Sequence, residues 1–399
     1  MGTDQILKEA RQAYEQARTL TSSSQVEKSG MWSAQNKQTF WERGRSLSLE
    51  GTVKEAMRAR LIAFTHPVHS KAFGLTLEEL KQDFASSGMK LDELPESVEE
   101  SDLLGPELTM QLRGRRLSTD FLYRLRIWSR LRESLPSERA TVLEIGAGLG
   151  NLARVIKLLQ PGARYMILDL PETLFFSHLF LRYSFPEART LYITDPDSLL
   201  SLDRSGERPD FIFIPAGLYR VIPRMQVDLV VNTHSLGEMR QETVEAYLWL
   251  IQQRLEVRFL YSLNRFLQID PAMGNPSEAT QATCSLPLDR DWKLRSWNYP
   301  PPFVRMNRIP GDTEETLEVF AERIRPEERD PEGSRQQGRQ FLKQAQECEI
   351  KGSREWLRLM WEAVRLNLDE ENIRVFYDYL SAAECRERRY YAKRLQEVK

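Results

Sequence analysis

The residues with the clearest chemical signature form a glycine-rich stretch at positions 142–153, which reads Val-Leu-Glu-Ile-Gly-Ala-Gly-Leu-Gly-Asn-Leu-Ala. The acidic Glu144 stands two residues before the first glycine, Gly146. Glycines at such spacing let the backbone turn tightly and let a ligand approach the main chain. A dinucleotide fingerprint needs a glycine where Asn151 stands, and the sequence lacks the Gly-Lys-Ser/Thr of a phosphate-binding loop. A carboxylate beside the glycines favours a cationic ligand over a pyrophosphate.

A second carboxylate, Asp169, follows Gly150 by 19 residues and ends the next apolar run. An acid at the end of that strand can accept both hydroxyls of a ribose. S-adenosylmethionine carries an ammonium, a sulfonium and a ribose, so Glu144 and Asp169 together predict this cofactor. The alternative is an ordinary strand-to-helix turn in which Asp169 only caps the helix.

His234 is the histidine best placed for chemistry. It follows the apolar run Val227–Asn232 by two residues, at the edge where open α/β sheets place their sites. A neutral imidazole there can remove the proton of an alcohol. Glu238 begins the next helix and could orient the imidazole or bind substrate. The alternative is that the residues around His234 only cap that helix. His178 lies in an apolar helix, and we expect it to pack in the core.

These residues lie at the ends of apolar runs that alternate with helical patterns. The alternation predicts βαβ units and a parallel sheet buried on both faces. Farther along, Trp292–Tyr299 and Phe303–Ile309 alternate apolar and polar residues around three prolines, which predicts an antiparallel hairpin. The predicted fold class is therefore α/β, with a mostly parallel sheet that ends in a hairpin. The expected parallel strands are Ala140–Ile145, Tyr165–Leu170, Thr190–Thr194, Asp210–Ile214, Val227–Asn232 and Arg258–Leu263.

Helical patterns flank this core and divide the chain into three predicted regions. Residues 1–115 form an N-terminal helical region that serves as a lid or in oligomerisation, residues 116–310 the core, and residues 311–399 a C-terminal helical region. We expect the C-terminal helices to pack on the core or on a second copy of the chain. Among the helices before the core is one with Ile6, Ala10, Tyr14 and Ala17 at helical spacing.

Composition and charge narrow the classes of partner. The 399 residues include 56 Lys+Arg and 58 Asp+Glu, a formal net charge of -2. This balance argues against a dedicated nucleic-acid binder and permits a homo-oligomer. No stretch approaches the roughly 20 apolar residues that span a bilayer, and the N-terminus does not resemble a signal peptide. We therefore expect a cytoplasmic protein without membrane contact, and we expect no metal site because cysteine pairs and acidic clusters at metal spacing are lacking.

The glycine motif, Asp169 and the predicted hairpin resemble class I S-adenosylmethionine-dependent methyltransferases over about residues 116–310. More narrowly, Ile167–Leu174, Phe211–Ala216 and Asp228–Met239 are similar to bacterial sugar O-methyltransferases. The resemblance implies a Rossmann-like sheet of seven strands whose last two form an antiparallel hairpin. It also implies an enzyme that methylates a hydroxyl of a sugar or sugar-bearing small molecule, with His234 as general base.

In this resemblance the glycine loop lies beneath the methionine moiety, Asp169 holds the ribose, and the end of the third strand meets the adenine. Two runs compete for that strand: Thr190–Thr194, followed by Asp195, and Phe211–Ile214, followed by Pro215 and Ala216. The resemblance favours the second. The predicted cofactor-binding residues are Glu144, Gly146, Ala147, Gly148, Gly150, Asp169, Leu170, Pro215, Ala216, Asn232 and Thr233.

A long polar stretch after the fifth strand, extending to Arg290, is the predicted substrate loop. Asn264 and Arg265 at its start suit a polyol or an anionic group. Two alternatives to sugar methylation stay open at this point. One is a methyltransferase of another small-molecule natural product. The other is a cofactor-binding interaction protein that works through its C-terminal helices.

Overall fold

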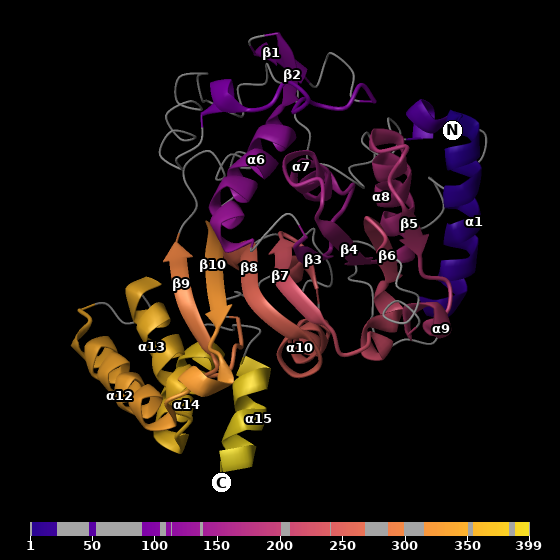
Figure 1. The fold of residues 1–399 in the computed structure, drawn as a ribbon. Helices are drawn as coiled ribbons and strands as arrows, with labels where there is room; N and C mark the ends of the chain where they lie inside the picture. Colours follow the sequence, from indigo (N-terminus) through magenta and orange to yellow (C-terminus); the bar gives the residue numbers. More distant parts are fainter. Residues whose placement is uncertain are drawn as a thin grey trace.

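In the computed structural model one large sheet lies between the C-terminal helices at one end and the helices near the N-terminus at the other (Figure 1). The structure describes residues 2–21, 48–52, 90–103, 109–112, 114–135, 139–200, 208–239, 241–267, 286–298, 315–349, 354–382 and 388–398. Within these ranges, no helix combines the length and apolar character that crossing a membrane requires.

The main sheet has eight strands in the order β5-β6-β4-β3-β7-β8-β10-β9. The strands from β5 to β8 pair in parallel, and β10 pairs antiparallel with both β8 and β9. The predicted α/β class is therefore confirmed. The strands are β3 (Thr141–Ile145), β4 (Arg164–Asp169), β5 (Thr190–Tyr192), β6 (Phe211–Pro215), β7 (Gln226–Thr233), β8 (Glu256–Leu267), β9 (Trp292–Asn298) and β10 (Glu315–Arg323). A separate two-stranded sheet joins β1 (Thr109–Leu112) to β2 (Arg115–Ser118).

Both runs that competed for the third strand form strands, which is why the main sheet has eight strands and not seven. β6 pairs with β4, so the preference for Phe211–Ile214 is confirmed. β5 adds outside β6 as a short edge strand. The Asp195 that follows β5 accepts a hydrogen bond from the Ser198 amide (2.7 Å) and so caps the short helix α9 (Pro196–Leu200).

The predicted hairpin is right in its first arm and differs in its second. β9 matches Trp292–Tyr299, but its antiparallel partner is β10, while Phe303–Ile309 lies outside the described residues. The sheet thus extends past residue 310, and its strand β10 lies within residues 311–399, which were predicted to be helical. The Glu, Leu and Ala of residues 315–323 are good helix formers. Pairing on both sides and burial of Val319 and Ala321 override that local preference.

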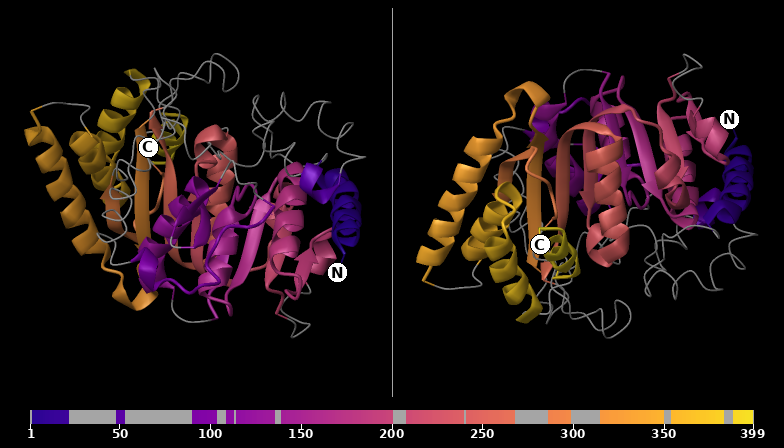
Figure 2. Two further views of the ribbon diagram at one scale, coloured as in Figure 1. Left: turned by 90° about the horizontal axis from the view of Figure 1, so that it is seen from above. Right: turned by 90° about the horizontal axis from the view of Figure 1, so that it is seen from below.

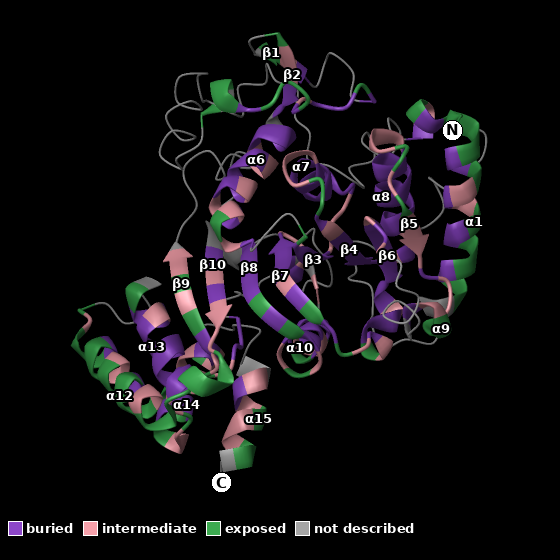
Figure 3. Cartoon of the chain, viewed as in Figure 1, coloured by how far each residue is buried: buried purple, intermediate pink, exposed green. Residues whose placement is uncertain are grey.

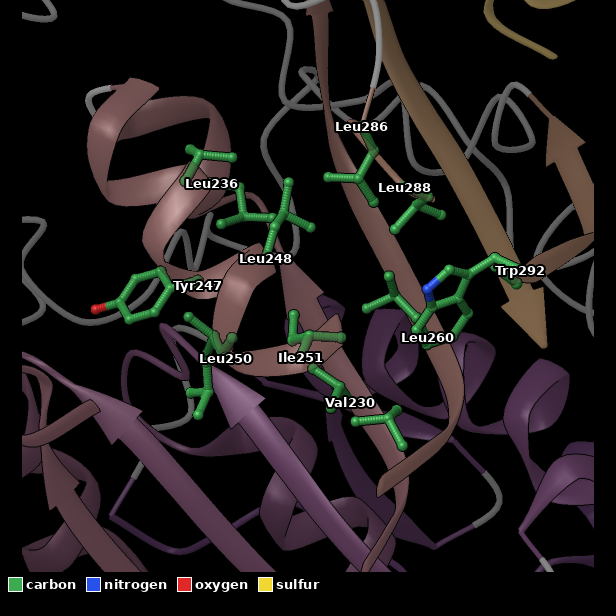
Figure 4. Close-up of a cluster of buried hydrophobic side chains, with 14 of the residues drawn as sticks. Val230, Leu236, Tyr247, Leu248, Leu250, Ile251, Leu260, Leu286, Leu288 and Trp292 are labelled. Carbon is green, nitrogen blue, oxygen red and sulfur yellow. The ribbon is translucent and has the colours of Figure 1, made fainter. Parts of the chain in front are cut away.

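Helices cover both faces of the sheet. One face carries α6 (Thr119–Leu131), α7 (Asn151–Leu159) and α8 (Pro171–Ser184), whose apolar residues share a core with Val142, Tyr165 and Phe213. The other carries α10 (Gln241–Trp249) and the following π-helical turn (Leu250–Arg254), which pack on Val230 and Leu260 (Figure 4). Alternate residues of each buried strand therefore serve opposite cores.

The two ends of the chain pack at opposite ends of the sheet (Figure 2). The predicted first helix, α1 (Thr3–Thr21), buries Ile6, Ala10 and Tyr14 and lies along α8, where the rings of Tyr14 and Phe175 are 6.2 Å apart. Most of the remaining N-terminal region lies outside the described residues, so its role as a lid or in oligomerisation stays a prediction.

The C-terminal helices pack on the core, one of the two arrangements expected. They are α12 (Pro331–Glu347), α13 (Arg354–Leu366), α14 (Glu370–Ala382) and α15 (Arg388–Val398). Trp361 of α13 is buried with its ring 5.6 Å from that of Trp297 in β9. Arg365 donates to the Asp289 carbonyl (3.1 Å) and pairs with buried Glu362. Figure 3 shows a buried inner face on α13 and an exposed outer face on α12.

Candidate active site

The glycine loop and His234 meet where the direction of the sheet reverses. After β3 the chain builds β4 and β6 on one side, and then returns to place β7 on the other side of β3. α7 and α8 accordingly lie on one face, and α10 on the opposite face. The loops after β3 and β7 diverge at this point, and open α/β sheets bind their ligands in that crevice.

Three glycines hold the loop after β3 in a left-handed conformation. The φ angles are 73° at Gly146, 60° at Gly148 and 88° at Gly150. The Gly146 amide donates to the Leu168 carbonyl of β4 (2.9 Å), which fixes the loop to the neighbouring strand. A Cβ on Gly146 would lie 2.0 Å from Ser235 Oγ, in the loop after β7. Backbone conformation therefore favours glycine at all three positions, and close approach to Ser235 also requires it at Gly146.

Asp169 joins the glycine loop to the start of α8. Its Oδ2 accepts from the Gly148 amide (3.1 Å) and its Oδ1 from the Leu170 amide (2.7 Å). Burial raises the pKa of Asp169 to about 7, although these two amides favour the ionised form. Each oxygen keeps a second acceptor position, so the carboxylate can also take hydroxyl donors. Pro215 pairs with Asp169 in register and Ala216 follows it, so the residues predicted at the adenine lie beside this acid.

Glu144 lies within β3 and is 1 % exposed. Tyr165 of β4 donates its hydroxyl to Oε2 (2.8 Å). Burial raises the pKa of Glu144 to about 7, against the opposing charge of Arg124. The acid of the glycine motif thus accepts a hydrogen bond from Tyr165 on the neighbouring strand β4. Its contact with a cationic ligand stays a prediction.

This buried acid gives a pH-dependent stability. Because the pKa of Glu144 is higher in the folded chain than its usual 4.5, the unfolded chain releases the proton first as pH rises. The wild type therefore loses up to about 3 kcal/mol of unfolding free energy between pH about 4 and about 8. We expect Glu144→Gln to remove this loss. The unfolding free energy of the variant, measured with urea, should therefore increase relative to that of the wild type as pH rises.

The matched control is Glu256→Gln, which changes an exposed glutamate paired with Arg224. Its unfolding free energy should follow the wild type at every pH. A constant difference between Glu144→Gln and the wild type across the pH range would contradict the prediction.

Two asparagines fasten the loop after β7. Asn232 donates to the Ile145 carbonyl (2.7 Å) and to Ser235, and its Oδ1 accepts from Asn264 (2.8 Å). Asn264 in turn accepts from the Gly237 amide (3.1 Å). These buried amides connect β3, β7 and β8, so the structure gives both a positioning role at the site. Their predicted contacts with cofactor and substrate stay predictions.

Two further predicted residues are placed by their backbone. Glu238 was expected to begin the next helix, but it ends the short 3-10 helix Leu236–Glu238, and α10 begins only at Gln241. Arg265 lies in β8, in register with Thr316 of β10. Their proposed roles toward His234 and the substrate stay predictions.

His234 is held at both its backbone and its ring. Its φ of 65° is positive, the only such value among the described non-glycine residues. The backbone amide donates to the Leu263 carbonyl (2.7 Å), and ring atom Nε2 lies 2.6 Å from the Tyr123 hydroxyl. A residue other than glycine keeps a left-handed backbone only where its surroundings impose it, and such residues concentrate at functional sites.

The α6 side chains that complete the site were missed in the sequence. Arg124 donates to Thr233 Oγ1 (2.9 Å) and pairs with Asp120, which also accepts from Asn151 after the glycine loop. α6 thereby connects the loops of β3 and β7. The available signal was the acid–base pair at a spacing of four residues, which marks one helix face.

His178 is a core residue, as expected. Its ring lies 4.8 Å from that of Phe213 and 5.4 Å from that of Tyr192. Burial lowers its pKa to about 3, so it packs as a neutral imidazole.

The topology and the switch-point loops define an α/β protein with a Rossmann-like sheet. Comparison with protein-family models finds no match, and comparison with curated proteins finds none. Similar solved structures include the magnesium protoporphyrin IX methyltransferase ChlM of Synechocystis PCC 6803 with bound SAH: 13% identity, TM-score 0.33, 51% of this chain and 84% of that one. The N-terminal domain of EvdMO1 with SAH bound is 14% identical, with a TM-score of 0.33 over 54% of this chain and 90% of that one.

The pyocyanin biosynthetic protein PhzM is 15% identical, with a TM-score of 0.31. The match covers 50% of this chain and 57% of PhzM, so it spans little more than half of that protein. Identities and TM-scores of this size carry no activity or substrate over to this chain.

Proposed function

We propose that this chain is an S-adenosylmethionine-dependent methyltransferase that methylates a hydroxyl of a sugar or sugar-bearing small molecule. The observation that supports it most is the Asp169 carboxylate, which bridges the glycine loop and α8 at the switch point of the sheet. His234, at the end of the strand beside β3, adds a base at the same edge.

The residues present fit the cofactor. Gly146, Gly148 and Gly150 hold the loop in the left-handed turns that place it beside Asp169, and Asp169 can accept the ribose hydroxyls. Burial holds the pKa of both Asp169 and Glu144 near neutrality, so a cationic ligand would stabilise their ionised forms. Leu170, Pro215 and Ala216 would border the adenine. Bound there, S-adenosylmethionine supplies a methyl group activated by its sulfonium.

The protein's own contribution is position and proton removal. Holding two reactants in line can lower a barrier by about 7–11 kcal/mol. The contacts of Asn232, Thr233 and Asn264 fix the loop on which His234 stands, which serves that purpose. A base placed at an attacking hydroxyl typically adds a factor of about 10²–10⁴ in rate. His234 would fill this role.

A small acceptor is favoured over the alternatives by two observations. The near-zero net charge does not suit a nucleic-acid acceptor. The C-terminal helices bury Trp361 and Met360 in the core, so these apolar side chains have a structural use within the chain itself. The sugar itself rests on the similarity of the strand-end segments to sugar O-methyltransferases.

Titration calorimetry with S-adenosylhomocysteine tests the cofactor site. We expect micromolar binding to the wild type and a loss of about 10- to 100-fold in Asp169→Ala, since hydrogen bonds to a charged group contribute about 1.5–3 kcal/mol. Asp195→Ala, in which the removed acid caps α9, is the matched control and should bind like the wild type. Folded wild-type protein that does not bind would overturn the proposal.

An acceptor screen tests the sugar. Purified protein with S-adenosylmethionine should release S-adenosylhomocysteine when sugars or glycosylated small molecules are added. Methyl transfer confined to acceptors without a sugar would support the methyltransferase activity and overturn the proposal of a sugar substrate.

A further inference from the structure

The contact between Tyr123 and His234 joins two elements that are far apart in the sequence. The Tyr123 hydroxyl on α6 lies 2.6 Å from His234 Nε2 at the end of β7, and the two residues are 111 positions apart in the sequence. The two ring centroids are 5.9 Å apart. Since His234 is the proposed base, a group bonded to its ring nitrogen takes part in any proton transfer there.

The direction of this hydrogen bond follows from the environment of the phenol. Burial raises the pKa of the Tyr123 hydroxyl above its usual value, against the opposing charge of Arg124. Asp120 and Glu318 raise it further. The phenol therefore keeps its proton. The phenol can then donate this proton to Nε2, and with the hydroxyl as donor the neutral imidazole carries its own proton on Nδ1.

Tyr123 stands on the side of α6 that faces the site. Its neighbour Arg124 donates to Thr233 at the end of β7, and Asp120, one turn earlier, accepts from Asn151 after the glycine loop. The Arg124 guanidinium lies 4.9 Å from the centre of the Tyr123 ring. Phe121 and Leu125 on the same helix are fully buried, whereas Tyr123 is only partly buried. Tyr123 thus shares the side of α6 whose polar residues reach both loops of the crevice, and its own hydroxyl meets His234.

We propose that Tyr123 relays the proton of the substrate hydroxyl to His234. The phenolic oxygen accepts the substrate proton while the phenol's own proton passes to Nε2. The O–H bonds of substrate and phenol break, and a new phenolic O–H and an N–H on the imidazole form. Tyr123 ends neutral, His234 ends as an imidazolium, and the substrate oxygen keeps the electron pair of its broken O–H bond.

The relay rests on the proposed methyl transfer to a hydroxyl, and it explains the use of two residues. A tyrosine that ionised alone would leave a buried phenolate beside Asp120, which burial disfavours. With His234 accepting the proton in the same step, the phenol never carries a full negative charge. The imidazolium afterwards returns its proton to solvent.

Nitrogen NMR of protein labelled with ¹⁵N-histidine tests the relay without an acceptor. The chain has four histidines, and the His234 signals are those missing in His234→Asn. In mildly alkaline solution we expect wild-type Nε2 to show the shift of an unprotonated nitrogen and Nδ1 that of a protonated one. Tyr123→Phe should remove this preference. A protonated Nε2 in the wild type, or an unchanged spectrum in Tyr123→Phe, would overturn the relay.

Kinetics supply the second readout. With the acceptor found in the screen, Tyr123→Phe should transfer methyl at least about 100-fold more slowly, at the lower end of what a proton-transfer group contributes. Its affinity for S-adenosylhomocysteine should stay within about two-fold, because the relay touches the substrate side. Tyr377→Phe makes the same change at a partly buried residue of α14, and this variant should keep the wild-type rate.

The outcomes separate the two proposals. Wild-type protein that binds no S-adenosylhomocysteine and transfers no methyl group overturns the proposed function, and the relay with it. Wild-type protein that transfers methyl, with Tyr123→Phe retaining more than a third of the rate, overturns the relay alone.

Discussion

The His234→Asn variant is expected to transfer methyl about 10²- to 10⁴-fold more slowly than the wild type, the usual contribution of a placed base. Its affinity for S-adenosylhomocysteine should change little, because the proposed contacts of Asp169 and the glycine loop with the cofactor come from the ends of β4 and β3. Asparagine tolerates the left-handed backbone at this position, so the hydrogen bond from the backbone amide of residue 234 to the Leu263 carbonyl should persist. Rates under saturating cofactor, together with calorimetric titration, measure both quantities.

His234→Ala provides the comparison for this variant. It removes the same imidazole. Alanine, however, lacks the polar side chain that helps asparagine adopt the left-handed φ of 65°, and this conformation costs an ordinary residue about 1–2 kcal/mol. We therefore expect it to match His234→Asn in rate and to unfold at lower urea. If either folded variant transferred methyl within threefold of the wild type, His234 would not be the base.

The parallel part of the sheet could be predicted because its strands are buried on both faces. Such strands appear as continuous apolar runs, and β3, β4, β6 and β7 are each close to the predicted range. The placement of Asp169 and His234 follows from the same runs, since each residue stands where a run ends. The glycine spacing gave the loop conformation for a similar reason: a left-handed backbone selects glycine.

The features that could not be predicted depend on contacts between distant segments. β10 forms from residues with helical preference because β8 and β9 pair with it on both sides. Tyr123 meets His234 across 111 residues, and Glu144 meets Tyr165 across 21. A contact of this kind leaves no period in the sequence. The sequence therefore located the candidate groups for the chemistry, but not the groups that form hydrogen bonds with them.

The second large effect is expected at Gly146, where the glycine loop touches the loop of His234. In Gly146→Ala the new Cβ would lie 2.0 Å from Ser235 Oγ and 2.4 Å from Ser235 Cβ, at a backbone φ of 73°. The left-handed conformation costs about 1–2 kcal/mol and forced repacking a further 1–3. We expect urea unfolding to show a loss of about 2–5 kcal/mol, and calorimetry to show weakened binding of S-adenosylhomocysteine.

Two variants separate the backbone cost from the collision. Gly114→Ala has a similar φ of 79° with nothing within 4 Å of its new Cβ, so it should lose only the backbone part. The double variant Gly146→Ala, Ser235→Gly removes the colliding atoms and should recover stability toward that of Gly114→Ala. Because Ser235 also bonds Asn232 and the Ile145 carbonyl, this recovery will be incomplete. If Gly146→Ala cost no more than Gly114→Ala, Gly146 would not be packed against Ser235. The hydrogen bonds of Asn232 and Ser235 to the Ile145 carbonyl would then be the contacts that position the His234 loop against the glycine loop.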